Sequence, residues 1–112
     1  MKIYHNTRCR KSREGVQYLT NKKLNFEIFD YLKEGVSEDD IKSILKKLNM
    51  SAIEIVRKNE KIWKDNFKGK ELKEEQIISI LCEEPKLIER PIIVHKNKAV
   101  IGRPKENIDN LL

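Results

Sequence analysis

The N-terminal part of the chain carries signals for a strand, a helix and a second strand, the order of a βαβ unit. Residues 2 to 5 are predicted to form a strand, and residues 10 to 22 a helix with Val16 and Leu19 on its inner side. Residues 25 to 30 alternate in the manner of a second strand. A βαβ unit of this kind has parallel strands, so an α/β fold is expected.

A glycine and a capping box mark the start of a helical segment. Gly35 interrupts the chain, and Ser37-Glu38-Asp39-Asp40 form a capping box with acidic residues in the first helical turn. Apolar residues then recur at helical spacing until Pro85, which ends the last of these helices. Within this segment, a short helix capped by Ser51 is predicted to carry Arg57.

Two strands and a helix are predicted for the last quarter of the chain. Residues 91 to 95 and 99 to 101 would pair as a hairpin, and Pro104 suits the first turn of a closing helix. The order βαβ, helical insertion, ββα resembles the thioredoxin-like arrangement, with a small mixed sheet flanked by helices. We therefore expect a single thioredoxin-like domain over residues 1 to 112, with the insertion at about 37 to 84.

Cys9 lies where the first predicted strand gives way to the first predicted helix. Free backbone N–H groups and the positive end of the helix dipole favour an anion there. Ser12 could donate its hydroxyl to a thiolate, and four neighbours are cationic: Arg8, Arg10, Lys11 and Arg13. These features predict a lowered pKa for Cys9 and a reactive or anion-binding role. The alternative, a small buried apolar residue, fits poorly with such charged neighbours.

Arginine is much rarer than lysine in this chain, which makes its positions informative. Of 24 basic residues only six are arginine, and three of these flank Cys9. Arginine differs from lysine where a planar fork must hold an oxyanion through two hydrogen bonds. The other three are Arg57, Arg90 and Arg103. The alternative for each is a surface ion pair, which for Arg57 could involve Glu54 or Glu60.

Charge and cysteine content argue against several classes of protein. The net charge is +6, but 18 acidic residues are interleaved and aromatic residues make up only 6% of the chain, so direct nucleic-acid binding is not expected. No apolar run approaches the roughly 20 residues of a membrane helix. Two cysteines without an apolar leader argue against a secreted disulfide scaffold, and no zinc spacing is present. A cytoplasmic protein with no metal site and no membrane partner is expected.

Four segments of the chain resemble motifs of the glutaredoxin-coupled arsenate reductase family. They occur in the family's order and together extend over almost the whole chain: residues 4 to 13 around Cys9, Ile55-Val56-Arg57-Lys58, Glu89-Arg90-Pro91-Ile92-Ile93-Val94 and Ile101-Gly102-Arg103-Pro104. The resemblance also implies a cis peptide bond before Pro91, as thioredoxin-like proteins have at the start of this strand.

The resemblance implies a role for each site residue. Cys9 would be the nucleophile. The supporting residues around it would be His5, Ser12 and Arg13, and the residues that bind arsenate or a similar oxyanion would be Arg57, Arg90 and Arg103. In the family's reaction the thiolate attacks arsenate, glutathione attacks the adduct, arsenite leaves, and glutaredoxin resolves the mixed disulfide. Glutathione is thus a co-substrate, and no bound cofactor is implied.

Two alternative functions are compatible with the same sequence. Spx-type transcription regulators share the fold and bind RNA polymerase, but the Cys-x-x-Cys switch that they commonly carry would need a cysteine at Ser12. A general glutathione-dependent thiol reductase that does not act on arsenate is the second alternative. It is favoured by the large residues beside the cysteine, where characterised arsenate reductases tend to have small ones. Cys82 is expected to be a buried helix residue rather than a resolving cysteine.

Overall fold

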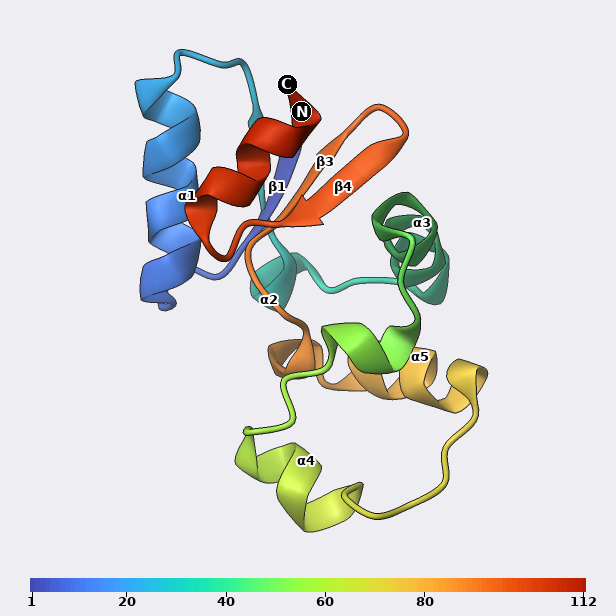
Figure 1. The fold of residues 1–112 in the computed structure, drawn as a ribbon. Helices are drawn as coiled ribbons and strands as arrows, with labels where there is room; N and C mark the ends of the chain where they lie inside the picture. Colours follow the sequence, from blue (N-terminus) through green and yellow to red (C-terminus); the bar gives the residue numbers. More distant parts are fainter. The chain divides into compact units, whose positions relative to one another are not determined.

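The computed structural model describes all 112 residues and divides into two compact units. The first unit combines Met1–Glu34 with Arg90–Leu112, and the second is Gly35–Glu89. The first contains the β-sheet, and the second is helical (Figure 1). No helix combines the length and the apolar character that crossing a membrane requires.

A four-stranded mixed sheet with the order β2-β1-β3-β4 is the framework of the first unit. Its strands are β1 (Lys2–His5), β2 (Glu27–Asp30), β3 (Ile92–His95) and β4 (Lys98–Ile101). β1 and β2 are parallel, whereas β3 is antiparallel to both β1 and β4. The predicted parallel βαβ unit, the hairpin and the thioredoxin-like fold class are therefore confirmed.

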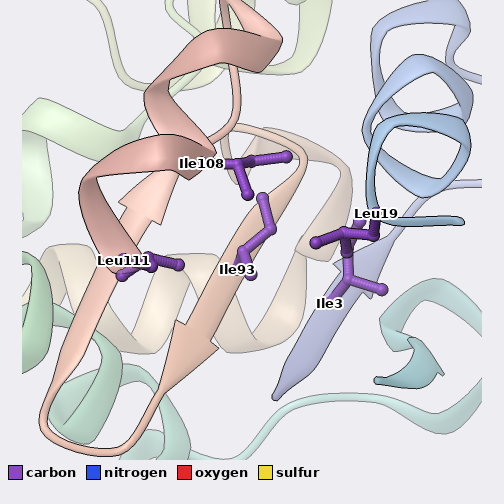
Figure 2. Packing of buried hydrophobic residues seen from close by; sticks show 5 residues of the cluster. All are labelled: Ile3, Leu19, Ile93, Ile108 and Leu111. Carbon is purple, nitrogen blue, oxygen red and sulfur yellow. The ribbon is translucent and has the colours of Figure 1, made fainter. Parts of the chain in front are cut away.

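The helices of the first unit are α1 (Arg10–Asn21), α2 (Tyr31–Glu34) and the 3-10 helix η3 (Lys105–Leu111). Figure 2 shows Ile3 and Ile93 of the sheet packed with side chains from α1 and η3. The residues of this cluster are at most 7% exposed: Ile3, Leu19, Ile93, Ile108 and Leu111. Burial of this apolar layer holds α1 against the sheet, and α1 begins directly after Cys9.

Several predicted boundaries in the first unit were wrong by one or two residues. β2 begins at Glu27 rather than at residue 25, because β1 begins at Lys2, which is the partner of Glu27 in the parallel register. Lys98 belongs to β4, and the hairpin turn contains only two residues, the first being Lys96 with a φ of 56°. Pro104 precedes η3 rather than forming its first turn.

The second unit contains α3 (Glu38–Leu48), α4 (Lys61–Asn66) and α5 (Glu74–Glu83), with the 3-10 helices η1 (Ala52–Ile55) and η2 (Pro85–Leu87). The predicted capping box of α3 is confirmed, since the Asp40 N–H donates to Ser37 Oγ at 3.0 Å and the Ser37 N–H donates to Asp40 Oδ2 at 3.2 Å. The apolar residues predicted to face inward are buried in α3 and α5: Ile41, Ile44, Leu45, Leu48, Ile77, Ile80 and Leu81.

The short helix predicted to carry Arg57 ends before it. η1 stops at Ile55, and Val56 instead forms an isolated antiparallel bridge with Ile88. The Arg57 N–H donates to the Leu87 carbonyl oxygen at 2.7 Å. Val56 and Ile88 are β-branched and favour extended backbone, and their pairing gives the segment hydrogen-bond partners that a helical turn would otherwise supply.

Candidate active site around Cys9

Cys9 occupies the N-cap position of α1 and is only 8% exposed. A tight loop brings the chain there from β1. The Cys9 N–H donates to the Asn6 carbonyl oxygen at 3.0 Å, and the Arg13 N–H donates to the Cys9 carbonyl oxygen at 3.0 Å. The sulfur therefore lies at the helix end where backbone N–H groups are not used by the helix itself.

The surroundings of Cys9 favour its thiolate. Burial raises the pKa of the thiol, but the Arg90 side chain donates a hydrogen bond to the sulfur and lowers that pKa. The backbone N–H groups of Ser12 and Lys11 and the positive charge of Arg90 act in the same direction, and the net pKa lies below the ordinary value. Arg90 is itself only 8% exposed, so water screens this interaction weakly.

The first turn of α1 carries cations where helices normally prefer anions. Arg10, Lys11 and Arg13 lie in this turn, and no acidic residue accompanies them there. Glu14 balances part of the charge, at 3.5 Å from Arg10 Nε and 3.6 Å from Lys11 Nζ. Cations at the positive end of a helix dipole destabilise the helix, and a bound anion removes this penalty. The arrangement therefore suits an oxyanion beside the sulfur.

Ser12 acts through a different group from the one predicted. Its hydroxyl lies 2.6 Å from His5 Nδ1 and accepts the Asn6 N–H at 2.9 Å, whereas its backbone N–H favours the Cys9 thiolate. Ser12 is fully buried, so these partners satisfy an oxygen that water does not reach. The hydroxyl thus joins β1, the loop and α1 behind the cysteine.

His5 lies on the inner side of this arrangement at the end of β1. Burial lowers the pKa of its imidazole, Asp30 partly opposes that shift, and Arg13 reinforces it. A neutral ring is therefore favoured, and it is held by the short contact with Ser12. Arg13 also fastens the loop, since its Nη1 donates to the Thr7 carbonyl oxygen at 3.0 Å.

The hairpin brings Arg90 and Arg103 to one end of the sheet. Ile92 of β3 pairs with Ile101 of β4. Directly beyond them Pro91 pairs with Gly102, whose N–H donates to the Pro91 carbonyl oxygen at 2.8 Å. Each arginine is one residue beyond this pair, and each is followed by a cis peptide bond to a proline. Two arginines far apart in sequence are thus neighbours along the backbone pairing.

Pro91 packs tightly against α1. A Cβ built on Gly15 would lie 2.9 Å from Pro91 Cγ, and one on Gly102 would lie 3.1 Å from it and 2.7 Å from Ile93 Cδ1. Real Cβ atoms do not come within 2.9 Å of a proline ring, so Gly15 requires glycine for steric reasons, whereas a Cβ at Gly102 would require the end of the Ile93 side chain to shift. The close contact holds the segment bearing Arg90 against the helix that begins at Cys9.

Replacing Gly15 with alanine should destabilise the protein, although alanine normally favours a helix. The propensity gain of about 1 kcal/mol is outweighed by overpacking against a rigid proline ring, which costs about 1–3 kcal/mol. Urea denaturation should show a net loss of about 1 kcal/mol. Thr20→Ala, on the exposed side of α1, is the control and should be neutral or stabilising. A stabilised Gly15→Ala protein would contradict the tight contact.

Arg57 lies in the second unit, in the extended segment after η1. Its Nε is 3.5 Å from Glu60 Oε1, and Lys86 Nζ is 3.8 Å from the other oxygen of Glu60. The ion pair with Glu60 raised by the sequence is therefore present. Glu54 serves a different purpose, because its carboxylate accepts the Ser51 N–H at 2.6 Å.

The two cysteines lie in contrasting environments. Cys82 lies in α5, half-buried, and burial together with Glu38, Asp40 and Glu83 raises the pKa of its thiol. Neither cysteine is in a disulfide. A raised pKa disfavours the thiolate, so Cys82 lacks the setting of a nucleophile. No group of three or more His, Cys, Asp or Glu side chains is placed to hold a metal ion.

Two residues of the site were not predicted to have a role. Asn6 is buried and joins the loop together, since its Oδ1 accepts the Arg8 N–H at 2.9 Å and its carbonyl oxygen accepts the Cys9 N–H. The preference of asparagine for such turns is the signal that could have identified it. Asp30 acts on His5 from the neighbouring parallel strand, and only the register His5↔Asp30 reveals it.

Comparisons with known proteins identify the family that the chain resembles. The model of the ArsC family matches residues 4–111. The chain is 41% identical over 110 residues to the uncharacterized protein YfgD of Escherichia coli, covering 96% of this chain and 92% of that protein. It is 36% identical over 112 residues to an arsenate reductase of Haemophilus influenzae, covering 98% and 97%. The solved structure of the arsenate reductase from Vibrio cholerae is similar with a TM-score of 0.94 and 33% identity, covering 100% of this chain and 98% of that one.

Proposed function

Because the chain belongs to the ArsC family, we propose that it is a thiol-dependent arsenate reductase whose nucleophile is Cys9. The observation that carries the proposal is the buried Cys9 at the start of α1, with its pKa lowered by Arg90 and by backbone N–H groups. The names of the Haemophilus influenzae relative and of the Vibrio cholerae structure support arsenate as the substrate.

In the proposed reaction the Cys9 thiolate attacks the arsenic atom of arsenate and displaces one oxygen as water. A thiol, proposed to be glutathione, then attacks this adduct. The two sulfur atoms become a mixed disulfide and give up two electrons, which reduce As(V) to As(III), and arsenite leaves. Glutaredoxin, with further glutathione, returns Cys9 to its thiol form. Because glutathione and glutaredoxin keep thiols reduced inside cells, the reaction is proposed to occur in the cytoplasm.

The residues around Cys9 have distinct proposed roles. Arg90 holds the thiolate and, with Arg103, faces the oxyanion with planar donors that match its oxygens. His5 and Ser12 keep the loop in place behind the sulfur, and Arg13 supports the same loop through Thr7. A thiolate and a charged oxyanion repel one another, so this concentration of donors and positive charge is what lets them meet.

The proposal is tested by NADPH oxidation coupled through glutathione reductase, with glutathione, glutaredoxin and arsenate. Oxidation that requires both arsenate and the protein supports it. Turnover with a small disulfide but none with arsenate would instead leave a general thiol reductase. If neither substrate is turned over, the enzyme proposal fails, and binding to RNA polymerase would then be measured.

Arg57 is proposed to bind arsenate rather than to activate the thiol. Its segment pairs with residues 87 to 89, which directly precede Arg90 in the chain. Arg57→Ala should raise KM for arsenate about 10–100-fold, since one charge-assisted donor is lost, and leave the pH dependence of Cys9 alkylation unchanged. Lys58→Ala, an exposed neighbour, is the control. An unchanged KM would remove Arg57 from the site.

A further inference from the structure

A cavity of about 280 Å³ lies beside the loop that leads to Cys9. Its walls come from the loop after β1 and from the junction of β2 with α2, all within the first unit: Asn6, Thr7, Arg8, Asp30, Leu32 and Lys33. Three of these, Arg8, Leu32 and Lys33, have no part in the proposed attack on arsenate, and Asp30 is connected with it only through its effect on the pKa of His5. The cavity is therefore a candidate binding site for another participant.

The walls of the cavity carry charges of both signs and one apolar side chain. Arg8 and Lys33 are exposed cations, Asp30 is a half-buried carboxylate, and Leu32 is 41% exposed although it is apolar. A simple anion would be attracted by two of these groups and repelled by the third. A ligand that carries a carboxylate and an ammonium group on neighbouring atoms, next to a short methylene chain, matches all four.

The backbone around these side chains is held by hydrogen bonds. Asp30 Oδ1 accepts the Lys33 N–H at 3.2 Å, and Asn6 Oδ1 accepts the Arg8 N–H at 2.9 Å. The backbone of the cavity walls is thus ordered before any ligand arrives, which lowers the entropic cost of binding.

Two residues of the cavity wall are connected to the surroundings of Cys9. Arg8 directly precedes Cys9 in the chain, and Asp30 pairs with His5, whose imidazole contacts Ser12 beside the cysteine. A ligand bound in the cavity and reacting at Cys9 would therefore lie along the loop that joins β1 to α1.

We propose that this cavity binds the amino-acid end of a low-molecular-weight thiol, the chemical class to which glutathione belongs, while the sulfur of that thiol reacts at Cys9. The ammonium group pairs with Asp30, the carboxylate pairs with Arg8 and Lys33, and the methylene chain lies on Leu32. This inference rests on the proposed function for the use of a thiol, and it adds the place where that thiol is recognised.

The test uses a reaction that does not involve arsenate. The Cys9 thiolate attacks one sulfur of oxidised glutathione, the Cys9–glutathione disulfide forms, and one glutathione thiolate leaves. Rates are measured by stopped flow in a Cys82→Ser background, so that Cys9 is the single thiol. Bis(2-hydroxyethyl) disulfide undergoes the same exchange but carries no charge, and it reports the intrinsic reactivity of Cys9.

Lys33→Gln should slow the reaction with oxidised glutathione about tenfold, the effect of losing one charge-assisted contact, without changing the rate with the neutral disulfide. Lys98→Gln makes the same change of net charge outside the cavity and should alter neither rate. Equal slowing by the two variants would reduce the effect to general electrostatic steering and overturn the proposal.

Asp30→Asn tests whether the cavity recognises a zwitterionic or an anionic ligand, because the two cases predict opposite changes in the ratio of the two rates. If the ammonium group pairs with Asp30, the ratio of the glutathione rate to the neutral-disulfide rate should fall. If the cavity merely attracts anions, removing the carboxylate should raise that ratio, and the proposal is wrong. The ratio also corrects for any change that Asp30 makes to His5 and Cys9.

The outcomes distinguish this inference from the proposed function. A glutathione preference that depends on Lys33 and Asp30, in a protein that does not turn over arsenate, would retain the thiol site and reject arsenate as substrate. Arsenate turnover by a protein in which Lys33→Gln and Asp30→Asn change nothing would retain the function and reject the site.

Discussion

Cys9→Ser is expected to abolish arsenate-dependent NADPH oxidation. A serine hydroxyl has a far higher pKa than a thiol and does not ionise near neutral pH, so the nucleophile is lost. Serine also cannot form a disulfide, so it cannot supply an electron to As(V). Because both the attack and the reduction depend on the sulfur, we expect a loss of at least ~10⁴-fold, to the background rate.

The matched control for this change is Cys82→Ser. Cys82 lies in α5 with a raised pKa, so its replacement should leave turnover within about twofold of the parent, in the range of an ordinary surface or helix substitution. Near-UV circular dichroism of both variants establishes that the fold is retained. If Cys9→Ser retained arsenate-dependent turnover that disappeared only when Cys82 was also replaced, Cys82 would be the nucleophile and the role proposed for Cys9 would be wrong.

Arg90→Ala is expected to have the second largest effect, because Arg90 acts on both the thiolate and the oxyanion. Without its hydrogen bond and charge, burial dominates and the pKa of Cys9 rises. The rate of alkylation by iodoacetamide follows the thiolate, so its midpoint moves to higher pH. In the arsenate assay kcat/KM should fall about 10²–10³-fold, the usual cost of removing one anion-stabilising donor.

Ionisation of Cys9 should also make the free energy of unfolding depend on pH. The folded-state pKa of Cys9 lies below its ordinary value, so this group adds stability above its unfolded pKa and loses it as the pH falls through the folded pKa. Arg90→Ala should reduce this pH-dependent part. Urea denaturation of parent and variant across that range measures it.

Two further variants make the Arg90 prediction specific. Arg90→Lys keeps the positive charge but not the planar guanidinium group. The pH midpoint of Cys9 alkylation should therefore lie between those of the parent and Arg90→Ala, while kcat/KM for arsenate stays low. Arg10→Ala removes a cation that is 84% exposed and paired with Glu14, and it should leave the alkylation midpoint unchanged. Equal shifts in Arg10→Ala and Arg90→Ala would mean that total charge, rather than the Arg90 contact, sets the pKa.

Much of the fold could be predicted because it depends on residues close together in the chain. The strand at residues 2 to 5, the helix that follows Cys9 and the capping box at Ser37 were all predicted and are present. Apolar spacing, caps and turn residues act over a few positions, and their preferences here do not conflict. The position of Cys9 at a helix N-terminus follows from the same local signals.

Local signals failed where a distant segment offered better partners. The residues from Val56 to Arg57 leave their predicted helix because Ile88 and Leu87 pair with them. The Ser12 hydroxyl was predicted to face the sulfur, but His5 and Asn6 occupy it. In both cases a polar group, the Arg57 N–H or the Ser12 hydroxyl, hydrogen-bonds to a residue outside its own predicted helix. The residues of that helix alone do not indicate this partner.

The order of strands and helices, the position of Cys9 at the start of a helix and the small number of arginines can all be read from the amino-acid sequence. Which groups contact the sulfur of Cys9 depends on the three-dimensional fold. The antiparallel register of β3 brings Arg90 to Cys9, the contact between Pro91 and Gly15 holds it there, and the parallel register of β1 and β2 sets Asp30 beside His5. The physical reason is that these contacts join residues far apart in the chain, and burial of the core selects their register.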